Sequence, residues 1–246
     1  MSEYIWGRNS VIEAINSKRT VEKIYMLKGN LKGSIETITA KAKEKKIPVS
    51  YMSEEKMNEI SKREKHQGVI ALISDLRYFS IDEIIEAAQE KGKKPLIVVL
   101  DELEDPHNVG SIIRSCEATG VDGIVIQKRN GVLATATVNK SSAGALNHMK
   151  ICKVVNISRT LKELKENGFW IYGADGEADK YYNEVNYDEN VVLVMGNEGF
   201  GIRPLVKKHC DFLVKLPMIG KISSLNVSNA CCVFLYEILR QRWEMK

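Results

Sequence analysis

A polar segment near the C-terminal end of this sequence has the residue types and spacing of a ligand site. In "KISSLNVSNA" (221–230), hydroxyl and amide side chains, Ser224 and Asn226 among them, come immediately before a helical apolar pattern at 227–240. One or two such residues would cap the helix. The remainder indicate a site that needs hydroxyls and amides at fixed positions.

A glycine-rich segment, "MGNEGFGI" (195–202), surrounds the carboxylate of Glu198. Glycines permit positive φ angles and a close approach of the backbone to a ligand. The pattern differs from the phosphate-binding glycine motifs, and it places a negative charge where a phosphate would sit. A neutral or cationic ligand therefore suits the segment better, although Glu198 could simply lie near the positive end of the next helix.

A third polar segment, "EDPHNVGSIIRSCEATG" (104–120), follows an apolar run. Asn108 is suited to cap a helix over 109–119. Arg114 falls outside the apolar stripe of that helix, and Gly110, one turn earlier, is expected to leave open space beside the guanidinium. The alternative is that Arg114 is an ordinary surface residue of an amphipathic helix.

The composition bounds the class of protein. The chain has 246 residues, of which 44% are hydrophobic and 28% charged, as in globular proteins. It contains no apolar run of about 18 residues and its start lacks the pattern of a secretory signal. Five cysteines without a C-x-x-C spacing or a histidine cluster favour a reduced, cytoplasmic protein without a metal site. The net charge of +4 permits a polyanionic partner.

The elements that must position these segments fall into two groups. Residues 1–75 alternate short helices and strands, which predicts a small α/β domain. Residues 76–94 are expected to form a linker that holds one amphipathic helix and ends in a Lys/Gly/Pro cluster. In 95–246, apolar runs separated by helical patterns predict a covered parallel sheet, with ligands bound at the carboxyl ends of its strands. These runs are 96–103, 123–127, 169–175, 191–196 and 212–218.

Taken in chain order, 104–120, 195–202 and 221–230, the three segments each follow a strand and resemble motifs 1, 2 and 3 of the SpoU (TrmH-type) branch of the SPOUT methyltransferases. "WGRNSVIEAI" (6–15) and "HQGVIALI" (66–73) are similar to the ends of the small L30e-like domain that binds substrate in this family. The resemblance covers nearly the whole chain. It implies an α/β fold in which a trefoil-knotted SPOUT domain with a Rossmann-like parallel sheet, 95–246, follows an L30e-like domain.

The resemblance also implies a cofactor and a reaction. S-adenosyl-L-methionine would bind in the knot, with contacts from Gly196, Leu216 and Leu225, and its methyl group would pass to a ribose 2′-hydroxyl of RNA. The residues that match the family's catalytic positions are Asn108, Arg114, Glu198, Ser224 and Asn226. Arg114 could act as a base or as an electrostatic stabiliser, in its own subunit or in its partner; a permanently protonated guanidinium favours the stabiliser.

The substrate follows from the branch of the family that the chain is most similar to, the enzymes that methylate a guanosine in the peptidyl-transferase loop of 23S rRNA. Alternatives are a tRNA ribose, another rRNA ribose, or a non-catalytic RNA-binding assembly factor. The expected partners are 23S rRNA or a pre-ribosomal particle, and a second copy bound through the knot region. Basic residues of the first domain could meet phosphates, namely Arg8, Lys18, Arg19, Lys28 and Lys32.

Overall fold

The computed structural model describes residues 3–16, 20–27, 33–74, 76–128 and 136–244. The chain divides into two compact units. The first contains the described residues through Arg77 together with Ala136, and the second contains the other described residues from Tyr78 onward. Four of the basic residues expected to meet phosphates, Lys18, Arg19, Lys28 and Lys32, lie outside the described ranges. No helix of the described residues is long and apolar enough to span a membrane.

The first unit is built on a mixed sheet with the strand order β1-β4-β2-β3. Strand β4 pairs antiparallel with both β1 and β2, and β2 pairs parallel with β3. Helices α1 and α2 bury apolar side chains against the sheet in one core. The elements are β1 (Glu3–Trp6), α1 (Arg8–Asn16), β2 (Thr20–Leu27), α2 (Ser34–Glu44), β3 (Val49–Met52), α3 (Glu54–Ile60) and β4 (Val69–Ser74).

The second unit contains a seven-stranded sheet among the described residues, with the order β7-β6-β5-β10-β8-β11-β9. Every pairing within it is parallel, which confirms the expected covered parallel sheet. Its elements are α4 (Ile81–Gln89), β5 (Leu96–Leu100), α5 (Pro106–Ala118), β6 (Gly123–Gln127), α6 (Ala136–Ser141), η2 (Ala145–Asn147), β7 (Ile151–Val154), α7 (Ile157–Glu166), β8 (Trp170–Ala174), β9 (Lys180–Tyr181), β10 (Val191–Met195), α8 (Pro204–Lys207), β11 (Phe212–Lys215) and α9 (Val227–Glu244).

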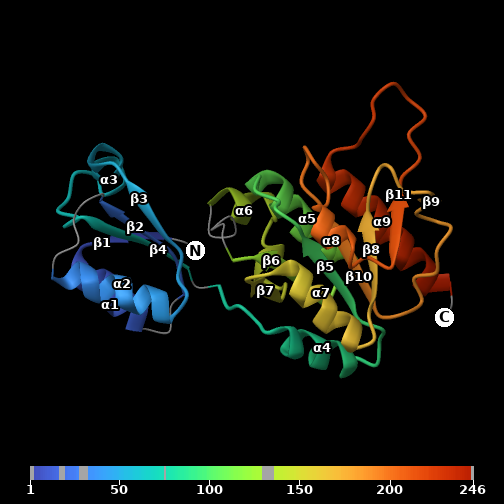
Figure 1. Cartoon of the computed structure of the whole chain (residues 1–246), viewed down its shortest axis with the longest axis horizontal. Coiled ribbons are helices and arrows are strands. Elements are labelled where there is room, and N and C mark those ends of the chain that lie inside the picture. Colours follow the sequence, from blue (N-terminus) through green and yellow to red (C-terminus); the bar gives the residue numbers. More distant parts are fainter. Residues whose placement is uncertain (1–2, 17–19, 28–32, 75, 129–135, 245–246) are drawn as a thin grey trace. The chain divides into compact units, whose positions relative to one another are not determined.

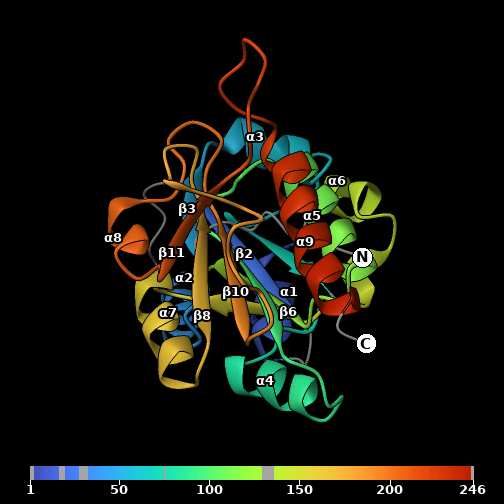
Figure 2. The ribbon, with the colours of Figure 1, turned by 90° about the vertical axis from the view of Figure 1, so that its right-hand side faces the viewer.

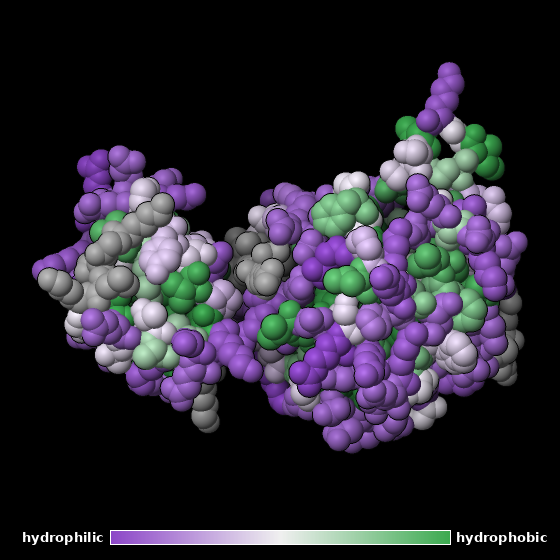
Figure 3. Space-filling model, in the orientation of Figure 1, coloured by the Kyte–Doolittle hydropathy of each residue, from purple (hydrophilic) through white to green (hydrophobic). Residues whose placement is uncertain are grey.

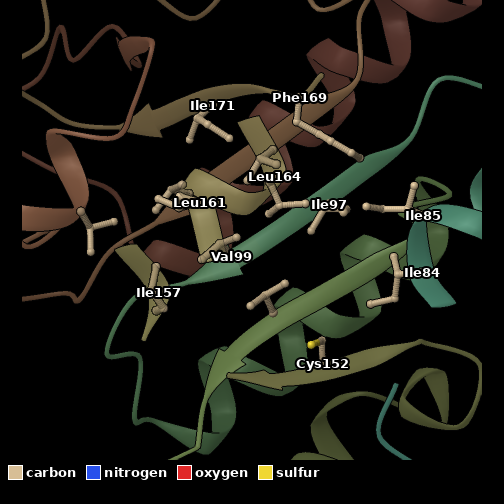
Figure 4. Packing of buried hydrophobic residues seen from close by; sticks show 14 of the residues in the cluster. Ile84, Ile85, Ile97, Val99, Cys152, Ile157, Leu161, Leu164, Phe169 and Ile171 are labelled. Carbon is tan, nitrogen blue, oxygen red and sulfur yellow. The ribbon is translucent and has the colours of Figure 1, made fainter. Parts of the chain in front are cut away.

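Helices cover both faces of this sheet (Figure 1). Figure 2 shows α7 and α8 on one side and α5 and α9 on the other. On the first side, alternate strand residues pack against α4 and α7, and in Figure 4 Leu164 and Ile85 lie on either side of Ile97. Strands buried on both faces explain why the sequence shows continuous apolar runs rather than alternation.

Helix α4 lies within the range 76–94 that the sequence assigns to a linker. Its Ile84 and Ile85 are buried in the core of the second unit. The capping box of Ser80 and Glu83 fixes the start of the helix, since Ser80 Oγ accepts from Glu83 N at 3.1 Å and Glu83 Oε2 accepts from Ser80 N at 2.7 Å. The chain between the two sheets is therefore in part a packed element of the second unit.

Candidate active site

A cavity of about 350 Å³ lies at the carboxyl ends of β8, β10 and β11, the edge where the sequence predicts ligand binding. Its lining comes from three segments that are far apart in the chain: the end of β8, the glycine-rich segment after β10, and the stretch from the end of β11 into α9. The sequence-predicted residues that line it are Gly196, Glu198, Leu216, Ser224 and Leu225.

A chain of side-chain hydrogen bonds joins all three polar segments beside this cavity. Asn226 Nδ2 donates to Asn108 Oδ1 at 2.9 Å, and Asn108 Nδ2 donates to Glu198 Oε1. Asn226 Oδ1 accepts from the backbone N–H of Ser228 at 2.9 Å and so caps α9. Because the cap fixes which end of the Asn226 amide faces Asn108, it also fixes the orientation of Asn108, which then presents a donor to Glu198.

The cap of α5 differs from the sequence expectation. Asn108 does not cap this helix; Asp105 does, and Asp105 accepts from His107 N at 3.3 Å and from Asn108 N at 3.0 Å. The helix begins at Pro106, which suits the first helical position because it has no N–H to satisfy. The expectation of a helix starting at 109 was wrong because it overlooked this acidic cap. As a result, the Asn108 side chain is free to bind Glu198 and Asn226.

The glycine-rich segment forms a tight turn closed by its own backbone. Asn197 and Gly201 exchange two backbone hydrogen bonds of 2.9 Å, and Gly201 has a φ of 69°. A Cβ on Gly196 would lie 2.2 Å from the Gly201 carbonyl carbon. Gly196 is therefore required for the turn itself, and not only for the approach of a ligand as the sequence suggested.

A second network of hydrogen bonds and ion pairs, next to this turn, was not predicted from the sequence. Arg203, just after the turn, binds the carboxylate of Asp101, a fully buried residue at the end of β5, and also binds Glu102. Hydrogen bonds to Asp101 raise the pKa of Arg203 above its ordinary value. The signal available in the sequence was an aspartate directly after the apolar residues 96–100, at a strand end like those that precede the other polar segments.

Arg114 is not brought together with the other predicted residues. It lies on the exposed side of α5, six residues after Asn108, which is roughly 9 Å along the helix axis and about 120° around it. Among the described residues it has no hydrogen bond or ion pair. The expected open space beside Gly110 is also absent, because a Cβ there would lie 1.8 Å from Ser141 Oγ of α6. Gly110 instead allows α5 and α6 to pack closely.

The segment 217–225, between β11 and α9, projects from the second unit (Figure 1). Within the described structure none of its residues makes a hydrogen bond. Ile219 is 98% exposed and Ile222 65% exposed, and Figure 3 shows hydrophobic side chains on this projection below a hydrophilic tip. This segment lies beside the cavity through Met218, Ser223 and Ser224 at its two ends.

The charges on the cavity wall suit a neutral or cationic ligand. Two carboxylates, Asp175 and Glu198, line it, and Lys207 forms an ion pair with the first. The basic residue of the lining is Lys215, whose ammonium lies 5.1 Å from the centre of the Tyr181 ring. Apolar side chains and glycine backbone form much of the remaining surface. Within the described part of the chain, no group of histidine, cysteine or acidic residues could hold a metal ion.

Comparisons with known proteins agree with this architecture. Residues 95–236 match the SpoU rRNA Methylase family, and residues 4–79 match a family described as RNA 2′-O ribose methyltransferase substrate binding. The chain is 42% identical over 240 residues to YacO of Bacillus subtilis (strain 168), provisionally named a TrmH family tRNA/rRNA methyltransferase. This alignment covers 98% of the chain and 96% of YacO.

Two solved structures share the fold. One is the SpoU methyltransferase AviRb from Streptomyces viridochromogenes in complex with the cofactor AdoMet, with a TM-score of 0.64 and 22% identity, covering 99% of this chain and 91% of that chain. The other is the A. aeolicus TrmH/SpoU tRNA modifying enzyme, with a TM-score of 0.55 and 31% identity, covering 67% of this chain and 85% of that chain. The parallel α/β domain and the preceding small domain are thereby confirmed, whereas the knot stays a prediction.

Proposed function

The chain belongs to the SpoU rRNA methylase family of RNA methyltransferases, and we propose that it methylates the ribose 2′-hydroxyl of a guanosine in 23S rRNA, with S-adenosyl-L-methionine as the methyl donor. The observation that carries this proposal is the hydrogen-bonded chain of Asn226, Asn108 and Glu198, of which Glu198 lines the cavity. It gathers three distant segments at one point, as a shared site requires. In this proposal residues 1–75 bind RNA and residues 95–246 hold the catalytic site.

The cavity fits the proposed cofactor. S-adenosyl-L-methionine supplies a methyl group on a positively charged sulfur, and the walls offer Glu198 and apolar surface rather than a cluster of basic side chains. Gly196, Leu216 and Leu225 would hold it, and their positions on the lining support this assignment. AviRb, which shares the fold, was crystallised with AdoMet. The assignment of this cofactor to the cavity therefore rests on the fit of the lining and not on the fold alone.

The residues of this hydrogen-bonded chain would orient the ribose. Asn108 and Asn226 each use one amide N–H within the chain, which leaves the second N–H of each as a donor toward an oxygen of the substrate. Ser224, on the lining, adds a hydroxyl. Because a ribose hydroxyl is a weak nucleophile, positioned donors that stabilise the charge developing on its oxygen would supply the main part of the rate enhancement.

We assign Arg114 to the active site of a second copy of the chain in a homodimer. Its position, turned away from Asn108 on the exposed side of α5, supports action in trans. Helix α9, which packs against α5, exposes Val233, Tyr236 and Trp243 along one face at 39%, 52% and 68%. An apolar stripe of this kind is suited to burial against a partner. Tyr236→Glu should convert the dimer to a monomer in sedimentation velocity and abolish turnover.

Mixing two strongly impaired variants tests the action in trans. Arg114→Ala should abolish turnover and leave the affinity for S-adenosyl-L-methionine within a few-fold of the wild type. Glu198→Gln removes the carboxylate of the other half of the site. If each site combines Glu198 of one subunit with Arg114 of the other, a mixed dimer of the two variants regains one intact site. Co-refolded equal mixtures should then recover roughly a quarter of wild-type turnover, since half of the dimers are mixed. No recovery would assign Arg114 to its own subunit.

The substrate is decided by mapping the product. The protein is incubated with methyl-labelled cofactor and either unmodified 23S rRNA or unmodified tRNA, and the labelled nucleotide is located. Label on a 23S guanosine supports the proposal. Label on tRNA supports the second candidate, to which the tRNA modifying enzyme of A. aeolicus points, while the name of YacO covers tRNA and rRNA alike. An assembly factor without activity would bind RNA but give no calorimetric signal with S-adenosyl-L-methionine. All three functions would place the protein in the cytoplasm.

A further inference from the structure

We propose that Asp101 and Arg203 are a positioning pair, which holds the glycine-rich turn in the shape that the cofactor and Glu198 require. Neither residue lines the cavity, so both act through the turn. The inference rests on the proposed function for its catalytic meaning. Its structural part, that the pair keeps the backbone of residues 196–203 rigid, can be tested without any ligand.

The pair is joined by several hydrogen bonds of good geometry to a buried carboxylate. Asp101 is 0% exposed, and its two carboxylate oxygens accept three hydrogen bonds from Arg203: 2.9 Å from the backbone N, 2.8 Å from Nε and 2.5 Å from Nη2. The remaining Nη1 donates to Glu102 at 2.8 Å. A buried carboxylate is costly unless it is paired and hydrogen-bonded. The planar guanidinium brings two N–H donors to Asp101 Oδ1 and a third to Glu102, an arrangement that the single ammonium of a lysine does not reproduce.

The contacts clamp the turn at both of its ends. At the entrance, the backbone N of Asp101 donates to Met195 O at 2.8 Å, and Asn197 Nδ2 donates to Glu102 O at 2.9 Å. At the exit, Arg203 is held through its backbone and its side chain. Glu198 lies between these two clamps, where it meets Asn108 of α5. Since α5 follows the same loop that carries Asp101 and Glu102, the contacts with Arg203 fix the position of Glu198 relative to Asn108.

The same strand offers a matched control at its opposite end. Asp122 is 8% exposed, accepts from the backbone N of Leu96 at 3.0 Å and forms an ion pair with Lys91 at 3.1 Å. This pair is also a buried aspartate bound to a strand and to a basic side chain, but it lies at the amino end of β5, away from the cavity. A merely structural role predicts that the two pairs respond alike to substitution.

The experiment compares Arg203→Met and Arg203→Lys with Lys91→Met and Asp122→Asn. Three quantities are measured on each folded variant: amide hydrogen exchange of the peptide covering 196–203, the Kd for S-adenosyl-L-methionine by calorimetry, and kcat with the RNA substrate. We expect Arg203→Met to speed exchange in 196–203 at least tenfold and to raise Kd at least tenfold. Arg203→Lys keeps the charge but loses the several N–H donors of the guanidinium, so its exchange rate and Kd should lie between those of the wild type and Arg203→Met. The control variants should lower the thermal midpoint yet leave exchange in this peptide and Kd within twofold.

A double-variant cycle adds a readout that general destabilisation does not move. If Arg203 acts through Glu198, Glu198→Gln should cost much less kcat in the Arg203→Met background than in the wild type. The inference would be overturned if the two substitutions lowered kcat independently, so that the double variant showed the product of the two single losses. It would also be overturned if Arg203→Met behaved like Lys91→Met at a similar thermal midpoint. A wild-type protein that binds the cofactor but methylates no RNA would instead defeat the proposed function, and the exchange and Kd comparisons would still decide the role of the pair.

Discussion

Replacing Gly196 by alanine tests how the glycine-rich turn prepares the cavity. The added Cβ would lie 2.2 Å from the Gly201 carbonyl carbon, whereas carbon atoms in contact need about 3.5 Å, so the turn must open by about 1.3 Å. The two hydrogen bonds of 2.9 Å between Asn197 and Gly201 would then exceed hydrogen-bonding range. Each contributes about 1 kcal/mol. A loss of about 2 kcal/mol corresponds to a roughly 30-fold weaker Kd for the cofactor.

Gly199→Ala is the matched control in the same turn. Its Cβ would meet only Asn197 Oδ1, at 3.4 Å, so the turn should keep its shape. Titration calorimetry with S-adenosyl-L-methionine should give a Kd within about twofold of the wild type for this variant, since the loss is well below 1 kcal/mol. The reasoning fails if the two alanine variants bind the cofactor equally well, or if Gly196→Ala loses affinity only because the whole protein unfolds, which circular dichroism would reveal.

Three further predictions follow from the site and the core. Asn226→Asp keeps the cap of α9 but sets an oxygen against Asn108 Oδ1, so steady-state assays should show kcat lower by roughly 30-fold, about 2 kcal/mol, with an unchanged thermal midpoint. Asp105→Ala should lower the free energy of unfolding in urea by about 1–2 kcal/mol, whereas Asp105→Asn should lose much less. Burial raises the pKa of Cys152 from 9.0 to about 11 and that of Cys210 to about 12. The folded state keeps these protons while the unfolded thiols ionise, so their contribution to the free energy of unfolding is fully present below about pH 9 and is lost as pH rises toward 12. Between pH 8 and pH 10.5, the thermal midpoint should therefore fall less for Cys152→Ala than for the wild type.

Much of the fold was accessible from the sequence because burial leaves a clear pattern. The five apolar runs became β5, β6, β8, β10 and β11, and their continuity correctly indicated parallel strands covered on both faces. The strands that escaped prediction have weaker signals. Strand β9 has two residues, and β7 (Ile151–Val154) has four residues, interrupted by Lys153 and without a flanking turn signal. Partners distant in sequence, which no local pattern reveals, decide that such short segments pair.

The site was predictable as a set of residues but not as a geometry. Side-chain types identified Asn108, Glu198 and Asn226, and the hydrogen bonds that join them depend on the path of three loops. Local rules gave the wrong cap for α5 because Asp105 and Asn108 are both good capping residues, and the choice between them depends on Pro106 and on the partners that Asn108 finds elsewhere. The Asp101–Arg203 pair spans a hundred residues, so neither partner indicates the other in the sequence.

The exposed projection at 217–225, whose residues make no hydrogen bond in the described structure, offers a peptide bond that a protease can reach. Lys221 lies within it and is exposed to a trypsin-like protease, whereas segments held in helices or strands resist such enzymes. Cleavage there would separate α9, with its Asn226, from the strand that carries Leu216, although packing against α5 would keep the fragment in place. A nicked protein of this kind would remain folded while its cavity lost the covalent continuity of one wall. Protection from the protease would therefore report, on a gel and without any RNA, whether a small molecule occupies the cavity.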